Sequence, residues 1–260
     1  MARSEAREGG SLSLIQSLGR PIYKKVVLQA AYHANVLAVH SAPGICQRWM
    51  DKHNRRMFPQ WGMSPVILEL KDEAAYKKFY IAAKSAGAEW ENLLAAEVKQ
   101  ELQLAANFLG ELAEAVGELQ VARMGLRFYY LLPVPDFDEL RRLLLERCTR
   151  WADFAGAFGA QDADVGISWQ FDAGDANIHI TVGPVKREEF GKFFESVDVG
   201  RCAREDRERF FPSAALLFDG DFSQREEPLR NMRRFILRGE EFLESKFVGF
   251  QEALGIQAKE

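Results

Sequence analysis

The chain has 260 residues, of which 47% are hydrophobic and 28% are charged, and its formal net charge is −4. These values argue against a largely disordered chain and supply a sizeable core for one large domain or two small ones. The acidic balance argues against broad nonspecific binding to nucleic acid, which requires a basic surface. Since no apolar run is long enough to cross a bilayer, we expect no membrane contact.

The cysteines and the N-terminus both predict a cytoplasmic, reducing location. Cys46, Cys148 and Cys202 are widely spaced and form neither a disulfide framework nor a CxxC pair. Residues 1–20 are polar and lack the apolar segment of a signal peptide. We therefore expect residues 1–20 to form a flexible arm.

The first half of the chain shows strand and helix patterns in alternation. Trp90–Val116 is the clearest helix, because its apolar residues recur at three- and four-residue steps and Gly117 suits its C-terminal cap. Tyr76–Ala83 is ambiguous, and its aromatic and β-branched content favours a strand over a helix. The predicted elements are a strand at Lys24–Leu37, a helix at Gly44–Met57, strands at Ser64–Leu70 and Tyr76–Ala83, and the helix at Trp90–Val116.

A hairpin in the second half gives the strongest local signal. Val165–Asp172 and Ala176–Val182 alternate in hydropathy around the turn Ala173-Gly174-Asp175, as two antiparallel strands with one buried face do. Residues 186–211 stay unassigned. The other predicted elements are a strand at Gln120–Leu132, a helix at Phe137–Cys148 capped by Asp136, a buried strand at Ser213–Phe218 and an amphipathic helix from about Pro228 to Leu254.

This order of elements predicts an α+β fold, with a mostly antiparallel sheet, two long helices and duplicated strand-helix-strand-strand halves. We expect an arm at 1–20, a first half at 21–117 and a second half at 118–260, packed as one unit. The halves would share one continuous sheet or form two facing sheets. One irregular α+β domain is the alternative.

Three segments of the second half resemble a sporadically distributed bacterial family of uncharacterised proteins. Val121–Tyr129 is similar to the family's central strand, which carries arginine, glycine, arginine and tyrosine separated by hydrophobic residues. Leu216–Phe222 resembles its DxD strand, and Arg234–Leu254 resembles its closing helix. The chain departs from the family at Tyr129-Tyr130, where the family more often has Asn after the Tyr, and in its longer helix before the central strand.

The resemblance covers about half the chain and implies no known chemistry. The patchy occurrence of the family implies a place in mobile or defence-associated gene clusters. That context suggests an accessory protein of an antiviral system, such as a CRISPR-linked operon.

Four charged residues form the strongest candidate for a polar groove. Arg123 and Arg127 fall on one face of their predicted strand, and Asp219 and Asp221 share a face of another. In a functional interpretation the guanidinium groups hold an anion and the carboxylates orient it. We favour the structural interpretation, in which arginine and aspartate pair across two neighbouring strands.

Other constellations of reactive residues are incomplete. Asp219 and Asp221 lack a third acidic ligand for a divalent cation, and Cys46, His40 and His53 lack a fourth ligand for zinc. His179 would act as a base only if a carboxylate or nucleophile approached it from another segment, as in a hydrolase with Asp219 and Asp221. The alternative for His179 is a solvent-facing side chain.

Sequence motifs of cofactor binding are absent. The glycines match neither a phosphate-binding loop nor a dinucleotide fingerprint, and no GxSxG or HExxH motif occurs. The arginines between 201 and 209 alternate with acidic residues, which is typical of a solvated segment. Five phenylalanines bracket that segment and would be core or an exposed binding surface: Phe190, Phe193, Phe194, Phe210 and Phe211.

We therefore expect a protein that is not an enzyme and has no cofactor or metal. The leading hypothesis is an interaction or regulatory subunit, or adaptor, of a bacterial assembly, with a protein partner or a homodimer contacting the apolar stripes of the long helices. The alternative is a small-molecule binding module with a cleft between the halves. The residues expected to line that cleft are Trp169, Tyr129, Phe128 and Phe218.

Overall fold

The computed structural model describes residues 22–52, 57–117, 119–151, 155, 163–196 and 210–255. The predictions for the arm at 1–20, for His53, for Cys202 and for the arginines between 201 and 209 lie outside these residues. The strands are β1 Ile22–Tyr32, β2 Gln60–Ser64, β3 Ile67–Asp72, β4 Lys77–Ala82, β5 Ser85–Leu93, β6 Val121–Val134, β7 Ile167–Ala173, β8 Ala176–Lys186 and β9 Ala214–Arg225. The α-helices are α2 Val36–Lys52, α3 Ala95–Val116, α4 Phe137–Cys148 and α7 Met232–Ala253, and the 3-10 helices are η1 Arg187–Lys192 and η3 Leu229–Asn231.

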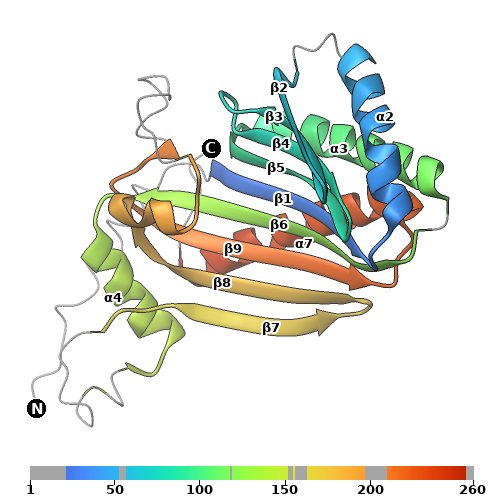
Figure 1. Cartoon of the computed structure of the whole chain (residues 1–260). Helices are drawn as coiled ribbons and strands as arrows, with labels where there is room; N and C mark the ends of the chain where they lie inside the picture. Colours follow the sequence, from blue (N-terminus) through green and yellow to red (C-terminus); the bar gives the residue numbers. More distant parts are fainter. Residues whose placement is uncertain are drawn as a thin grey trace, which may run out of the picture.

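The strands form one nine-stranded sheet in the order β2-β3-β4-β5-β1-β6-β9-β8-β7, and every neighbouring pair is antiparallel (Figure 1). The predicted α+β class with an antiparallel sheet is confirmed. The sheet is continuous across β1 and β6, so the two-sheet alternative is wrong.

The strand order is the same in both halves when it is read outward from the β1–β6 pair. The first half runs β1, β5, β4, β3, β2, and the second runs β6, β9, β8, β7. In each half a central strand leads through a helix to the outer edge, and the following strands return to the centre before a long helix. The first half has one strand more than the second, whereas the predicted elements gave the second half one strand more than the first. The division at 117 and 118 stays a prediction.

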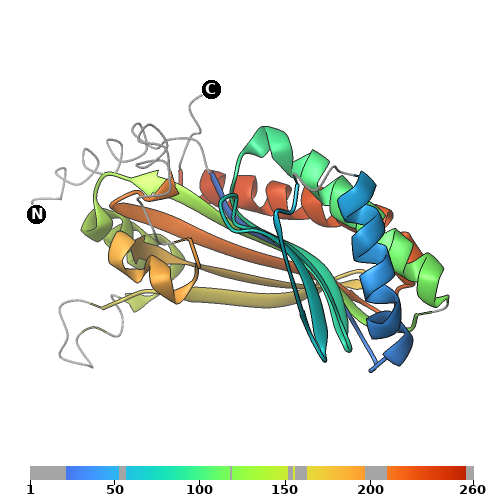
Figure 2. The ribbon, with the colours of Figure 1, turned by 45° about the horizontal axis from the view of Figure 1, so that its top comes forward.

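The α-helices cover one face of the sheet. α2 packs on β3 and β4, α3 on β5 and β1, α7 on β6 and β9, and α4 on β8 and β9. Figure 2 shows the two 22-residue helices α3 and α7 beside each other across this face. Most of the core lies in this layer and is rich in aromatic side chains.

A second, smaller core lies on the opposite face, at one end of the sheet. There η1 and the segments that flank it cover apolar residues of β1, β6, β8 and β9. Four of the five bracketing phenylalanines are buried in this core, and Phe193 is 43% exposed. We call residues 187–196 the cap, because they cover this end of the sheet.

Helix α2 begins eight residues earlier than predicted, and the strand before it ends at Tyr32 rather than Leu37. The side chain of Asn35 accepts a hydrogen bond from the backbone N–H of Ala38, which caps the first turn. Pro43 therefore lies inside the helix, where a proline normally interrupts hydrogen bonding. Burial of the helix face that includes Trp49 overrides this local cost.

The strands of the first half are more numerous than predicted. The segment Ser64–Leu70 is divided between β2 and β3, which are joined at Pro65-Val66. β5 was missed, because its inward residues are mostly alanine and its end, Trp90–Leu93, reads as the start of the following helix. Small residues give a weak period-two signal.

The second half matches the prediction more closely. Helix α4 has the predicted bounds, and Asp136 accepts a hydrogen bond from the backbone N–H of Glu139. β9 is longer than predicted and extends to Arg225, because polar residues continue its open face. The buried face predicted for the hairpin holds for β8 but not for β7, where Trp169 and Phe171 are 38% and 39% exposed at the sheet edge.

Glu240 of α7 is buried against the sheet, and we expect Glu240→Gln to stabilise the protein at neutral pH. Burial, and then the charge of Glu244, raise the pKa of the Glu240 carboxyl, and Lys99 of α3 opposes them. Tyr23 donates a hydrogen bond to Glu244, so that carboxylate is partnered. Since the native state holds the Glu240 proton more tightly than the unfolded chain, stability declines as the pH rises through the raised pKa.

The variant should therefore raise Tm at pH 8 by a few degrees, equivalent to about 1 kcal/mol, and leave it unchanged at pH 4. Thermal unfolding at both pH values is the measurement. Glu241→Gln, at an exposed neighbouring position, is the control and should change Tm little at either pH. An equal effect of Glu240→Gln at both pH values would contradict the expectation.

Candidate functional site

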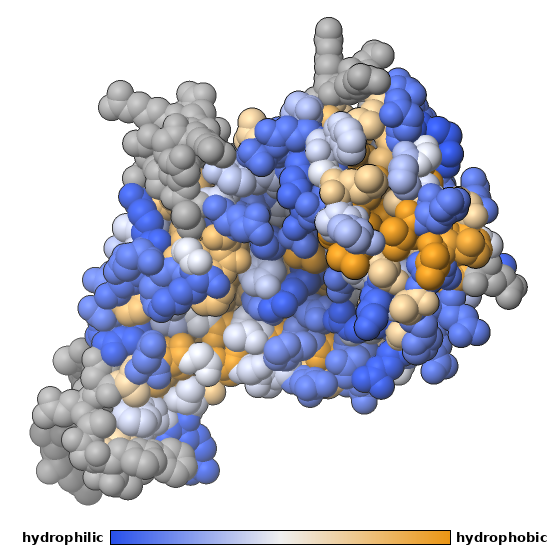
Figure 3. Space-filling model, viewed as in Figure 1, coloured by the Kyte–Doolittle hydropathy of each residue, from blue (hydrophilic) through white to orange (hydrophobic). Residues whose placement is uncertain are grey.

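The face of the sheet opposite the helices is open across its centre and polar (Figure 3). Cross-strand register places its side chains in rows that run over neighbouring strands. One row contains His179, Asp221, Arg127, Val27, Glu89 and Lys78 in the order β8, β9, β6, β1, β5, β4. The row beside it contains Thr181, Asp219, Tyr129, Lys25 and Glu91.

All four residues of the predicted polar groove lie on this open face and form two ion pairs between β6 and β9. Asp219 accepts two hydrogen bonds from Arg127, at 2.7 Å from Nε and 2.5 Å from Nη2. Asp221 accepts one from Nη2 of Arg123, at 2.6 Å. The side chains of Arg127 and Arg123 remain 41% and 39% exposed, so the pairs hold the two strands together while facing solvent.

The two arginines lie along β6 in the same direction. Arg123 extends over Gly125, where a Cβ atom would be 2.7 Å from its Nη1. Arg127 extends over the ring of Tyr129, with 4.7 Å between the guanidinium carbon and the ring centroid. The hydrogen bonds to Asp219 raise the pKa of Arg127, which stays charged. The glycine and the tyrosine therefore provide the path by which each arginine reaches its aspartate.

A second group of paired charges continues the open face into the first half. Nζ of Lys25 lies 3.4 Å from Glu91 and 3.8 Å from Glu89, and Nζ of Lys78 lies 3.3 Å from Glu89. Each charge therefore has an opposite neighbour. Across both halves the centre of the open face carries equal numbers of acidic and basic side chains in these pairs.

Two buried charged residues attach the cap to the sheet beside this group. The carboxylate of Glu91 accepts hydrogen bonds from the backbone N–H groups of Glu195 and Ser196, at 2.9 and 2.6 Å. Lys24 lies in a β-bulge between Tyr23 and Lys25 and is fully buried.

Sequence analysis did not single out Lys24. Its Nζ donates to Oδ1 of Asn92 at 2.5 Å and to Oγ of Ser196 at 3.0 Å, and it lies 4.0 Å from the ring centroid of Phe211. Asn92 has a positive φ of 58°, which is uncommon outside glycine and turns its side chain toward the amine.

His179 lies on the open face in a row with a hydroxyl and a carboxylate. Its Nε2 is 2.8 Å from Oγ of Ser168, and its register partner on β9 is Asp221. The condition stated for His179, a carboxylate and a nucleophile from other strands nearby, is met in register by Asp221 and in contact by Ser168, and the register of the hairpin could have revealed Ser168. Asp221 is bonded to Arg123, however, and both Ser168 and His179 are exposed to water at the sheet edge. These features favour the solvent-facing interpretation over a catalytic dyad.

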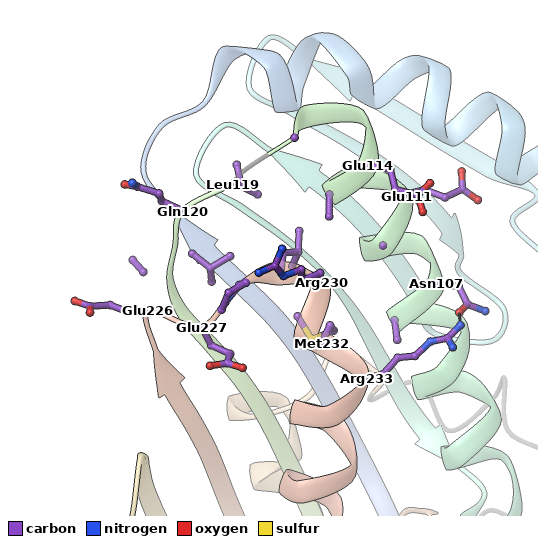
Figure 4. A pocket seen from close by; sticks show the side chains of 18 of the residues that line it. Asn107, Glu111, Glu114, Leu119, Gln120, Glu226, Glu227, Arg230, Met232 and Arg233 are labelled. Atoms are coloured by element: carbon purple, nitrogen blue, oxygen red, sulfur yellow. Dashed lines mark hydrogen bonds between the residues drawn. The ribbon is translucent and has the colours of Figure 1, made fainter.

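A cavity of about 1380 Å³ lies between the two halves (Figure 4). Its walls are the C-terminal part of α3, Gly117 with residues Leu119–Ala122, and the segment from Arg225 through η3 to the first turn of α7. Arg233 donates a hydrogen bond across it to Asn107 at 2.6 Å. The charged side chains of its lining are Lys52, Glu111, Glu114, Arg225, Glu226, Glu227, Arg230 and Arg233.

The aromatic residues predicted for a cleft between the halves do not line this cavity. Phe128 and Phe218 are fully buried in the main core. Tyr129 lies on the open face against Phe194, and Trp169 packs on Phe250 at the edge. Phe128 and Tyr129 are adjacent in β6, so alternation along the strand places their side chains on opposite faces of the sheet.

The described residues contain no group of three histidine, cysteine or acidic side chains placed to hold a metal ion. Cys46 lies on the buried face of α2, where desolvation raises the pKa of its thiol to about 12, and His40 is exposed on the same helix. In the part of the chain that the structure describes, no helix is both long and apolar enough to span a bilayer.

The fold and the open face define an α+β protein with a one-sided nine-stranded antiparallel sheet. No model of a known protein family matches the chain, and a search of curated proteins finds no match. The resemblance to the sporadically distributed bacterial family stays a prediction.

Proposed function

We propose that this protein is a non-enzymatic interaction subunit and that the open face of the sheet is its working surface. The observation that carries the proposal is the set of paired charges at the centre of that face, among which the two arginine side chains remain about two fifths exposed. A sheet face that only needed to be soluble would require no such ordered pairs. Side chains held in place before binding lose little conformational entropy when a partner arrives.

The chemistry of the pairs favours a protein partner. Each arginine keeps about two fifths of its side-chain surface exposed while its aspartate fixes its position. Such a guanidinium group has N–H donors for carbonyl or carboxylate groups of a second protein. Equal numbers of acidic and basic groups do not suit a polyanion, because binding to phosphate backbones requires excess positive charge.

The test removes one ion pair without leaving an unpaired charge. The double variant Arg127→Gln with Asp219→Asn is compared with the wild type by affinity purification at modest salt and native mass spectrometry, from cells that naturally contain the protein. The matched control is Arg238→Gln with Asp175→Asn, a bidentate pair at 3.0 and 2.5 Å between α7 and the β7–β8 turn.

We expect a stoichiometric protein partner with the wild type and the control, and its loss with the open-face variant. Circular dichroism checks that all three proteins are folded. Retention of the partner by the open-face variant would place the working surface elsewhere. A protein purified without any partner would contradict the proposal. We also propose that the assembly serves antiviral defence, and identification of the partner tests this.

The binding of a small polar ligand is a second candidate function, favoured by the cavity between the halves. It is large enough to admit a small molecule, and charged side chains line it from both halves. The same native mass spectra distinguish the two candidates. A bound small-molecule mass that Arg230→Ala removes would support the cavity, and a protein partner would support the open face.

A further inference from the structure

Strand β2 forms one edge of the sheet and exposes large apolar side chains. Trp61 and Met63 are 62% and 65% exposed, although both point to the helix-covered face in register with the buried Leu70 and Leu68 of β3. α2 makes its main contacts with the sheet on β3 and β4 and not on β2. These two side chains therefore continue the core face beyond the helix that should cover it.

The exposed apolar surface continues from β2 to the start of α2. The backbone of Ala83 accepts a hydrogen bond from Asn35 and donates one to Val66, which brings the β2–β3 turn beside the first turn of α2. Figure 3 shows hydrophobic side chains gathered at this place. We call this surface the β2 patch, and it consists of Val36, Leu37, Trp61, Met63 and Val66.

Within its five residues β2 lacks the features that normally prevent two edges from pairing, and the prolines that border it, Pro59 and Pro65, lie just outside the paired residues. Natural edge strands carry charged residues, prolines or bulges within the strand. The sequence of β2 is Gln-Trp-Gly-Met-Ser, without charge or proline, and its pairing with β3 is regular over all five residues. No described strand pairs with its outer edge. An unprotected edge beside exposed apolar side chains is typical of an interface.

We propose that β2 pairs with β2 of a second copy of this chain, antiparallel about a two-fold axis at Gly62. This register places Gly62 opposite the partner's Gly62 and each Trp61 opposite a Met63 of the other copy. The strand is therefore complementary to itself, as a closed two-fold interface requires. Aromatic and aliphatic side chains that face each other across two strands stabilise such a pair.

The available area supports a second copy as the occupant. The five side chains of the β2 patch expose on the order of 600 Å² per protomer, against about 800 Å² per partner in a standard interface. Backbone pairing along five residues adds to that area. The opposite edge, β7, is a weaker candidate, because Phe250 packs on Trp169 and reduces its exposure to 38%.

The dimer would join two nine-stranded sheets into one sheet of eighteen strands. A two-fold axis perpendicular to the sheet keeps both open faces on the same side. The inference is independent of the proposed function, because the β2 patch and the open face share no residue.

The first experiment measures the mass of the wild-type protein by light scattering after gel filtration in the micromolar range. We expect twice the chain mass of 29.5 kDa. Met63→Lys places a charge at the interface and should give the mass of a monomer. Gln170→Lys places the same charge at the exposed centre of β7 and should leave the dimer intact. Circular dichroism confirms that both variants are folded.

The second experiment tests the register with Gly62→Cys. A Cβ atom at Gly62 meets no other atom within 4 Å, so the protein should accept the substitution. Directly opposite residues of antiparallel strands have Cα atoms roughly 4.5–5.5 Å apart, within the range of a disulfide. Mild oxidation should link the two copies of Gly62→Cys, whereas Gln170→Cys and the wild type should stay unlinked.

Each other outcome overturns the proposal. A monomeric wild type excludes the dimer. A dimer that survives Met63→Lys, or that links only through Gln170→Cys, excludes the β2 edge. A polymer excludes the two-fold arrangement, because only pairing of β2 with a different edge leaves free ends.

Discussion

Gly87→Ala is expected to cost at least about 3 kcal/mol of folding free energy and to lower Tm by roughly 10 °C or more. Gly87 lies in β5 against the central strand β1, where a Cβ atom would be only 2.2 Å from the carbonyl oxygen of Leu28. That oxygen belongs to the backbone of a buried strand and cannot move aside without separating the sheet. Thermal and denaturant unfolding measure the effect.

Two other glycines provide matched controls for the same substitution. A Cβ atom at Gly249 or at Gly62 has no other atom within 4 Å. Gly249 lies inside α7, so alanine should stabilise the protein by about 0.5–1 kcal/mol through helix propensity. Gly62→Ala should have little effect. If Gly87→Ala unfolded at the same temperature as Gly62→Ala, the close approach of β5 to β1 would be wrong.

The sequence predicted those elements whose own side chains repeat with a clear period. The hairpin of β7 and β8, strand β6, and helices α3, α4 and α7 all have such patterns. β5 was not predicted, because its residues Ala86, Gly87 and Ala88 differ little in hydropathy and give no alternating pattern. The start of helix α2 was placed eight residues too late, because a proline normally interrupts a helix and tertiary burial stabilises this one with Pro43 inside it.

The candidate site was predicted in part for the same reason. Alternation along β6 and β9 places Arg123, Arg127, Asp219 and Asp221 on one face. The register of these adjacent strands then brings each arginine within reach of an aspartate. The pairs Lys25–Glu89 and Lys25–Glu91 depend on β5, so they were missed with it. Exposure of the β2 patch depends on where α2 ends its coverage, which no local pattern reveals.

The site and the proposed dimer contact use different surfaces of one sheet. Helices occupy one face, paired charges occupy the other, and the apolar β2 edge lies at one end. A second copy at β2 would therefore leave the open face free. It would also present two copies of that face to one partner, which raises the apparent affinity without any new contact.

Lys24→Ala is expected to cost about 3–5 kcal/mol and to loosen the cap before the rest of the protein unfolds. Lys24 is fully buried, and its amine is bonded to Asn92 and Ser196 beside the ring of Phe211. Alanine would leave a void beneath the cap and remove the donor that both oxygens use. Because Ser196 belongs to the cap, hydrogen exchange of the backbone amides of the cap should accelerate more than exchange in β6 or α7.

Two variants separate the role of the buried charge from that of packing. Lys78→Ala changes a lysine whose ion pair with Glu89 is partly exposed on the open face, and it should cost about 1 kcal/mol or less. Lys24→Met keeps the length of the side chain but not its donors, so its stability should fall between those of Lys24→Ala and the wild type. Hydrogen exchange by mass spectrometry and denaturant unfolding provide both readouts. Equal losses in Lys24→Ala and Lys78→Ala, with unchanged exchange in the cap, would show that Lys24 does not hold the cap on the sheet.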